Sequence, residues 1–329
     1  MTLVKTALAA GLAVGLSAAA GAAQAEDLKI GMITTLSGGG SGLGIDVRDG
    51  FMLALKQSGE SGIEVLIEDD ARKPDVAKQI ADKFIQRDKV DILTGIIWSN
   101  LAMAVVPAAL KDGVFYISPN AGPSELAGKL CHPHYFNVAW QNDNLHEAMG
   151  GYVQDNGYKK PFIMAPNYPA GKDALTGFKR YYTGDLGGMG IAFVKQYAQS
   201  GLTVPLFGPA FSFDQGILGA VGDAALGVKN TSQWSKDLDN PANKVFVESF
   251  QKEYGRLPSL YASQGYDTAN LIIAAWKQSG GPGADAEAFQ KALEAADFAS
   301  TRGSFKFASN HHPIQDIYVR EVVKEGDVL

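Results

Sequence analysis

The sequence predicts an α/β protein made of two doubly wound lobes, and three observations support this fold class. The chain has 329 residues, a length that favours two hydrophobic cores. Short apolar segments alternate with amphipathic helical segments, as they do in a parallel sheet covered by helices on both faces. This alternation stops at a loop over residues 120–133 and then starts again.

Residues 1–25 are expected to be a secretory signal, cleaved after Ala25. Lys5 precedes an apolar run rich in alanine and glycine, and Ala23-Gln24-Ala25 has the small-x-small form of a cleavage site. The alternative is a buried N-terminal helix, which the glycines of this run weaken. No later segment approaches 18 apolar residues, so we expect an exported protein with no direct membrane insertion.

The first lobe is predicted to follow strand–helix order. Its strands are expected at 28–36, 63–68, 90–97 and 114–118, and its helices at 47–57, from Pro74-Asp75 onward, and at 99–111. Pro74-Asp75 is a helix start signal. Val76, Ile80 and Phe84 then recur on one helical face.

The second half resumes the alternation with one irregularity. Its strands are expected at 135–139, 161–165, 204–207, 225–231, 305–307 and 317–323, and its helices at 143–156, 171–182, 187–200, 241–254, 264–278 and 284–296. Two of these helices follow one another around 183–186 with no strand between them. The rhythm of the fold is therefore expected to break at this point.

Charge and motif content exclude several classes of function. The formal net charge is −6 and no basic run occurs, so neither nucleic acid nor an anionic membrane is a predicted partner. A dinucleotide-binding loop fails on spacing, because the sixth position counted from Gly38 or Gly40 is Leu43 or Ile45. No G-x-S-x-G turn is present. We predict no cofactor and no enzyme activity, with a secreted α/β enzyme as an alternative.

No metal site is predicted either. Cys131, His132 and His134 supply too few well-spaced ligands for a closed site. His311-His312-Pro313 is interpreted as an exposed turn rather than a catalytic pair. Cys131 is the only cysteine of the chain.

Candidate ligand-binding residues lie where predicted strands end, because ligands of open α/β sheets sit beyond the carboxyl ends of the strands. Ser99 and Asn100 open a helix after the third strand. Ser99 is expected to be the N-cap of that helix, whose free N–H groups can hold an anion. The next strand ends in a turn of small residues, Asn120, Ala121 and Gly122, whose backbone can approach a ligand. Ordinary capping without a ligand is the alternative.

Aromatic residues gather at the same predicted loops and suggest an apolar slot with polar ends. They are Trp98, Trp140, Tyr168, Phe211 and Phe213. Each of them singly is also compatible with core packing.

Taken with the secretory signal, several segments together resemble the periplasmic substrate-binding proteins of ABC transporters, of the branched-chain amino-acid type. They are Leu28-Lys29-Ile30-Gly31, Thr35-Leu36-Ser37-Gly38, Glu68-Asp69-Asp70, Ile117-Ser118-Pro119 and Tyr266-Asp267-Thr268-Ala269. The resemblance implies a periplasmic protein with two lobes joined by three crossovers. It also implies a ligand clamped between the lobes and a membrane permease as partner. We expect a monomer.

The resemblance also assigns roles by position. Ser99 matches the serine that holds the ligand carboxylate, and the 120–122 turn matches the one that adds further bonds. Asn167 and Tyr168 fall on the second-lobe loop that carries a stacking residue. Trp98, Asn100, Trp140 and Phe211 complete the expected site.

One departure from the family pattern predicts the class of ligand. Amino-acid binders carry an acid just after a Gly-Pro, which pairs with the ligand ammonium, whereas this chain has Gly208-Pro209-Ala210-Phe211. A buried ammonium without a counter-charge costs about 3–5 kcal/mol. The chain therefore looks most like the branch that binds aromatic carboxylates such as benzoate or phenylpropenoid acids. A branched-chain amino acid is the alternative.

The lobes are expected to cover 26–141 with 263–302, and 142–262 with 303–329, with crossovers near 140–143, 257–263 and 301–303. Relatives place a strand, a helix and a strand where this chain has only 183–186. The second lobe is therefore expected to lack a β-α-β unit, with a strained or disordered turn over 185–190. A naturally shortened loop with a rearranged sheet is the alternative. Relatives of this branch also carry a C-terminal cysteine, so Cys131 is expected to be unpaired.

Overall fold

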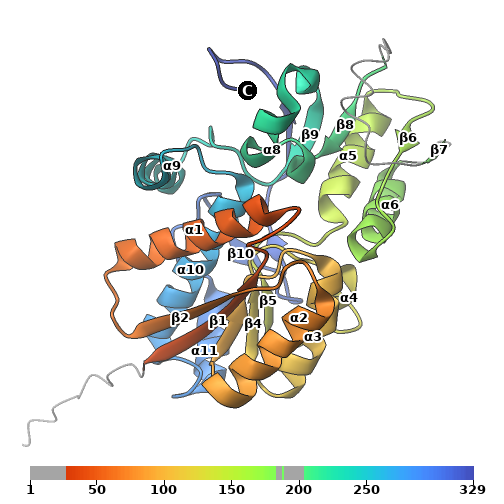
Figure 1. The fold of residues 1–329 in the computed structure, drawn as a ribbon. Coiled ribbons are helices and arrows are strands. Elements are labelled where there is room, and N and C mark those ends of the chain that lie inside the picture. The colour runs from red at the N-terminus through yellow and green to blue at the C-terminus, as the bar shows by residue number, and fades with distance from the viewer. Residues whose placement is uncertain (1–26, 183–186, 189–203) are drawn as a thin grey trace, which may run out of the picture.

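Five parallel strands form the largest sheet of the computed structural model, which describes residues 27–182, 187–188 and 204–329 (Figure 1). The strands are β1 Leu28–Thr34, β2 Ile63–Asp69, β3 Ile92–Thr94, β4 Phe115–Ser118 and β5 Tyr135–Asn137. Their order is β2-β1-β3-β4-β5, and every pairing is parallel. The predicted first-lobe sheet is thereby confirmed.

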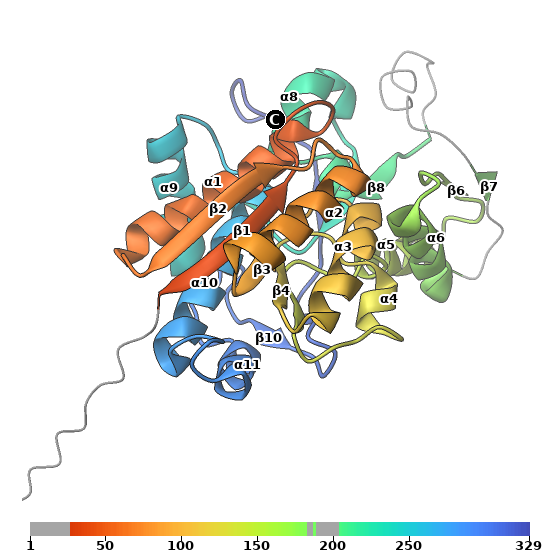
Figure 2. The ribbon, with the colours of Figure 1, turned by 60° about the horizontal axis from the view of Figure 1, so that its bottom comes forward.

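Helices cover both faces of this sheet, as the alternating pattern predicted (Figures 1 and 2). One hydrophobic cluster joins the sheet to α1 Ser41–Ser58, α10 Leu260–Ser279 and α11 Ala286–Ala295. The cluster on the other face joins it to α2 Pro74–Asp82, the π-helical turn Lys83–Asp88 and α3 Ser99–Lys111. A short helix that the sequence did not predict, α4 Ser124–Ala127, follows β4.

Helices α1 and α10 pack backbone against backbone. A Cβ atom at Gly50 would lie 1.9 Å from the Ala262 carbonyl oxygen, and one at Gly265 would lie 2.1 Å from that of Val47. Any side chain at these two positions would push the helices apart, so glycine is required at both.

The remaining described elements are shorter strands with the helices and turns between them. They are α5 Asn144–Asp155, β6 Phe162–Ile163, α6 Pro169–Tyr181, β7 Gly187–Gly188, β8 Phe207–Pro209, the 3-10 turn Ala210–Ser212, α8 Gln215–Val221, the 3-10 turn Gly222–Ala225, β9 Lys229–Ser232, α9 Pro241–Tyr254, β10 Lys306–Phe307, β11 Pro313–Ile314 and β12 Tyr318–Glu321. Strands β12, β9 and β8 form one sheet, and β6 pairs with β7 in another.

Several predictions for this part were wrong in detail. Gly187 and Gly188 pair with β6 as a parallel strand, so a strand follows α6 where a helix was expected. The predicted strand at 204–207 starts only at Phe207, and Val204 is exposed. The predicted strand at 225–231 starts at Lys229, because Gly222–Ala225 forms a 3-10 turn. Residues 1–26, 183–186 and 189–203 lie outside the described part of the chain.

The two histidines near the C-terminus are buried, which corrects the expected exposed turn. The His311 ring stacks on Phe136 at 4.1 Å between ring centroids, and its Nδ1 lies 3.0 Å from the Tyr135 carbonyl oxygen. Burial lowers the pKa of His312 to about 4. Both rings therefore complete the packing at the β5 edge of the sheet.

Cys131 is free and exposed. Among the described residues, no three His, Cys, Asp or Glu side chains come together as metal ligands. None of the described helices has the length and apolarity that crossing a membrane requires.

A buried ion pair ties α10 to the segment that follows α11. The Asp267 carboxylate accepts hydrogen bonds from the Ser300 hydroxyl at 2.6 Å, the Thr301 N–H at 2.9 Å and Arg302 Nη2 at 3.1 Å. Arg302 Nη1 also donates to Gln315 Oε1 at 2.7 Å, and Gln315 in turn donates to the Ala139 carbonyl at 2.7 Å. The predicted crossover at 301–303 is thereby bound to α10, and the chain at Ala139, just before the crossover near 140–143, is bound to it through Arg302 and Gln315.

The first prediction concerns this ion pair, whose side chains are 3% and 0% exposed. Arg302→Met should lower the free energy of unfolding in urea by about 3–5 kcal/mol, because it leaves the Asp267 charge buried without a partner. The matched control is Lys291→Met, which removes one partner of a solvent-exposed pair with Glu287 and should leave the stability nearly unchanged. Equal, small effects of both substitutions would show that the pair does not hold the fold.

Asp214 lies where α8 meets α1 and α10. Its Oδ1 accepts the Leu260 N–H at 2.9 Å, and its Oδ2 is 3.8 Å from Arg320 Nη1. A Cβ atom at Gly216 would lie 3.7 Å from the Asp46 carboxylate of α1. Burial, reinforced by the Asp46 charge and opposed by Arg320, raises the pKa of Asp214 to about 6.

The second prediction follows from that raised pKa. The folded state binds the proton of Asp214 more tightly than the unfolded state, so this group stabilises the fold below about pH 4, and its contribution is lost as the pH rises through 6. A shift of about two units corresponds to roughly 3 kcal/mol at most. In urea unfolding, the stability of the wild type relative to Asp214→Asn should fall between pH 4 and pH 7. Parallel pH profiles would contradict it.

Candidate ligand-binding site

Helix α3 begins at Ser99, one residue earlier than a serine N-cap would require. Trp98 occupies the N-cap position, and its carbonyl accepts the N–H groups of Leu101 and Ala102 at 3.0 and 2.9 Å. Its side chain does not cap the helix, because the indole N–H donates to Thr35 Oγ1 at 2.9 Å. The prediction that Ser99 is the N-cap was therefore wrong, and its hydroxyl is free for other contacts.

The Ser99 hydroxyl contacts Asn142 directly and Asp173 through Asn142, and neither residue was predicted to belong to the site. Asn142 Nδ2 lies 3.0 Å from Ser99 Oγ and 3.0 Å from Asp173 Oδ2. Ser99 and Asn142 are buried, and Asp173 is half-buried. A hydrogen-bonded chain thus runs from α3 through the segment before α5 to α6.

Most of the polar groups of the turn after β4 form hydrogen bonds within the protein. The Ala121 carbonyl accepts from the Ser118 hydroxyl at 2.7 Å and from Asn137 Nδ2 at 2.9 Å, and the Ala121 N–H donates to the Ile96 carbonyl at 3.3 Å. Asn120 Nδ2 donates to Gln264 Oε1 on α10 at 2.8 Å.

Gly122 lies against the next predicted site residue. A Cβ atom at Gly122 would stand 2.1 Å from the Trp140 carbonyl oxygen, so this turn and the chain near Trp140 are in direct contact. Asn100 is half-buried on α3, and Asn167 is exposed just before α6.

The candidate aromatic side chains form two groups. Trp140 is buried, and its ring centroid lies 6.3 Å from that of Phe211, which is 6.0 Å from the ring of His146. Tyr168, at the start of α6, forms the other group with Trp98 and Arg72. Phe213 does not join either group, because it packs into the small core around β9.

The Arg72 guanidinium lies 4.0 Å from the centroid of the Trp98 ring. Burial raises the pKa of the Tyr168 hydroxyl, and the nearby Arg72 charge opposes this rise. Trp98 on α3 and Tyr168 on α6 are therefore brought near one another with a cation beside both. Such a cation favours an anionic ligand.

His146 is a neutral member of the site. Burial lowers its pKa to about 4. Its Nδ1 lies 3.0 Å from the Asn142 carbonyl oxygen, an atom that only accepts hydrogen bonds. Nδ1 therefore carries the proton and Nε2 is left as an acceptor.

Arg72, Asn142, His146 and Asp173 are the residues that sequence reasoning missed. Asn142 lies in the predicted 140–143 crossover, so its position was a usable signal. Asp173 carries no local signal, because only the packing of α6 against α3 brings it near Ser99. Arg72 follows β2 and reaches Trp98 because β2 and β3 both pair with β1.

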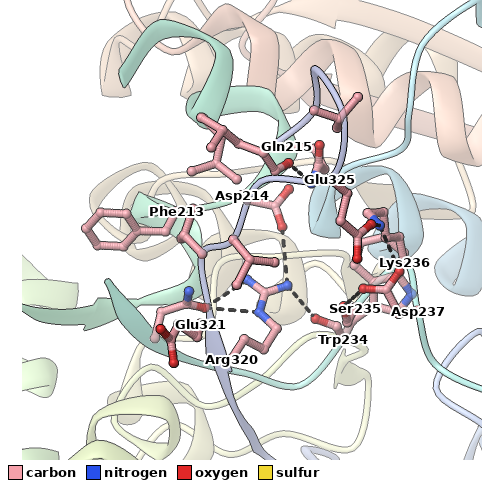
Figure 3. A pocket seen from close by; sticks show the side chains of 16 residues that line it. Phe213, Asp214, Gln215, Trp234, Ser235, Lys236, Asp237, Arg320, Glu321 and Glu325 are labelled. Carbon is pink, nitrogen blue, oxygen red and sulfur yellow. Dashed lines mark hydrogen bonds and ion pairs between the residues drawn. The ribbon is translucent and has the colours of Figure 1, made fainter. Parts of the chain in front are cut away.

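A cavity of about 190 Å³ lies apart from these residues, between α8, β9 and β12 (Figure 3). Its main polar group is Arg320, which donates to Asn230 Oδ1 at 2.9 Å and to the Trp234 carbonyl at 2.8 Å. Those bonds hold β12 to β9 and to the chain after it. We assign this cavity a structural role.

Comparisons with known proteins agree with the fold. The sequence profile of the periplasmic binding protein family matches residues 27–184 and 181–327. A Leu/Ile/Val-binding protein homolog of Brucella abortus is 28% identical over 359 aligned residues, which cover 94% of this chain and 91% of the homolog.

Two solved structures are also similar. A solute-binding protein of an ABC transporter from R. palustris, in complex with benzoate, is 32% identical, with a TM-score of 0.85 and coverage of 92% of this chain and 94% of its own. One from Rhodopseudomonas palustris in complex with 3,4-dihydroxybenzoic acid is 27% identical, with a TM-score of 0.80 and coverage of 92% and 94%. The chain belongs to the periplasmic binding protein family and is a solute-binding protein of the ABC-transporter type.

Proposed function

We propose that this protein is a periplasmic receptor that binds an aromatic carboxylate, of the benzoate or phenylpropenoid type, and delivers it to the permease of an ABC importer. It acts as a monomer after cleavage behind Ala25 and does not transform its ligand. The ligand lies between the two lobes, against the start of α3. Family membership supports the receptor role, and the charges of the site support the class of ligand.

One observation carries the choice of ligand, namely that Arg72 offers an anion a partner, whereas Asp173, the acid beside Ser99, already accepts hydrogen bonds from Asn142 and Ser124. Arg72 lies on Trp98, and the Ser99 hydroxyl stands at the start of α3. The nearest acid after Gly208-Pro209 is Asp214, whose carboxylate already accepts the Leu260 N–H and faces Arg320. Phe211, Trp140 and neutral His146 suit an apolar ring.

A thermal-shift screen of the purified protein tests this proposal. Benzoate, 3,4-dihydroxybenzoate and cinnamate should raise the melting temperature more than leucine, isoleucine or valine do, because a ligand that binds only the native state stabilises it. Chromatography should recover the bound acid unchanged. Tighter binding of leucine would favour the amino-acid receptor, and conversion of the acid would favour an enzyme.

The third prediction tests the role of Ser99. Ser99→Ala should weaken benzoate binding in calorimetry by about 1–3 kcal/mol, because a ligand oxygen loses a donor in a buried site. Ser58→Ala is the matched control, since the Ser58 hydroxyl donates to the Leu55 carbonyl at the far end of α1. Equal benzoate affinities of the two variants would show that Ser99 does not contact the ligand.

We also infer that the second lobe lacks a β-α-β unit of the family near residues 183–186. The family profile matches in two pieces that meet at residues 181–184, and the Brucella alignment is longer than this chain. Outside the five-stranded sheet and the β10–β11 pair, the described strands fall into two separate small sheets, and Phe162 on β6 is 62% exposed. In a complete β-α-β unit, a helix packed on the face of the sheet would cover such a residue.

The fourth prediction concerns the stability of that lobe. Peptides from α5 and α6 should exchange amide hydrogens faster than those from α1 and α10, because a small, open core opens at lower free energy. The open strand edge should also make the protein associate as its concentration rises in light scattering. The missing unit also predicts weak ligand affinity. In the thermal-shift screen, the order of the ligands is therefore more informative than the size of each shift. Uniform protection across both lobes would contradict the missing unit.

A further inference from the structure

We infer that Asp173 is a positioning residue, which orients Asn142 and so makes the Ser99 hydroxyl a hydrogen-bond donor toward the ligand. This inference rests on the proposed binding of a carboxylate at Ser99. Its basis is the chain of contacts in which Asn142 Nδ2 lies 3.0 Å from both Asp173 Oδ2 and Ser99 Oγ.

The polarity of this chain follows from the chemistry of its members. An ionised carboxylate only accepts hydrogen bonds, so Asp173 must face the amide nitrogen of Asn142 rather than its oxygen. The same nitrogen donates to Ser99 Oγ. The serine hydrogen is then directed elsewhere, and a ligand at the start of α3 meets a donor. A carboxylate accepts from such a donor with either oxygen.

The direction of these hydrogen bonds also depends on contact between the two halves of the fold. It lies on α6, and its Oδ2 accepts the N–H of Ser124 on α4 at 3.1 Å. Figures 1 and 2 show α6 beside α3 and α4, which belong to the five-stranded part. When the halves separate, Asp173 on α6 loses the N–H of Ser124 on α4, and Asn142, which precedes α5, loses Ser99 on α3. Ser99 is then no longer held as a donor.

Calorimetry with benzoate on three variants tests this inference. Asp173→Ala should weaken binding roughly tenfold, because Asn142 loses the acceptor that orients it. Asp173→Asn should retain most of the affinity, since its amide oxygen can still accept from Asn142 and Ser124. The control is Lys172→Ala, at an exposed neighbour on α6, which should bind as the wild type does.

A double variant separates positioning from a general loss of structure. If Asp173 acts through Asn142, the double variant Asp173→Ala with Asn142→Ala should bind no more weakly than Asn142→Ala alone. Multiplying losses, or an unchanged affinity of Asp173→Ala, would overturn the inference and leave the proposed function standing. Failure of the wild type to bind any carboxylate would overturn both. Melting temperatures without ligand identify any variant that loses affinity by unfolding.

Discussion

The buried pair of Asp267 and Arg302 is the contact on which the arrangement of the two halves depends. Two charges that are almost inaccessible to water cost several kcal/mol to bury, and only complete hydrogen bonding offsets this cost. Asp267 receives it from Ser300, Thr301 and Arg302, and Arg302 reaches Gln315 as well. Because Gln315 bonds the Ala139 carbonyl, the pair fixes the chain just before Trp140 and Asn142.

The position of the candidate site follows from that fixed segment. Asn142 stands between Ser99 on α3 and Asp173 on α6, so a small shift of the chain near Ala139 would break contacts on both sides. The close packing of α1 on α10 has a similar effect. Gly50 and Gly265 leave no space for adjustment, which makes the five-stranded part a rigid support. We therefore expect any movement between the halves to be confined to the predicted crossovers.

The sequence predicted the first lobe better than the second, for reasons visible in single elements. Helix α3 was predicted with its observed bounds, and so was α9, which begins at Pro241 and ends before Gly255. Strands β8 and β9 are only three and four residues long, too short for an alternation pattern to place. The burial of His311 and His312 arises from contacts with β5, about 175 residues away in the chain. Local sequence carries no record of such contacts.

Some residues of the candidate site could be predicted from the sequence, and others could not. Ser99, Trp98 and Tyr168 could be named because each lies at the end of a strand or the start of a helix. Asp173 could not, since it lies beyond the first turn of α6 and gains its role only from Asn142 and Ser124.

This distinction bears on what a missing unit in the second lobe would change. Asp173, Tyr168 and Asn142 belong to α5, α6 and the segments before them, all of which precede residue 183. Phe211 lies on the other side of the break. The groups that we propose to hold a carboxylate are therefore intact in this chain, whereas Phe211, which we propose to contact the ring, depends on how β8 is held. The missing unit should accordingly weaken discrimination between ligands with different rings more than discrimination between anionic and cationic ligands.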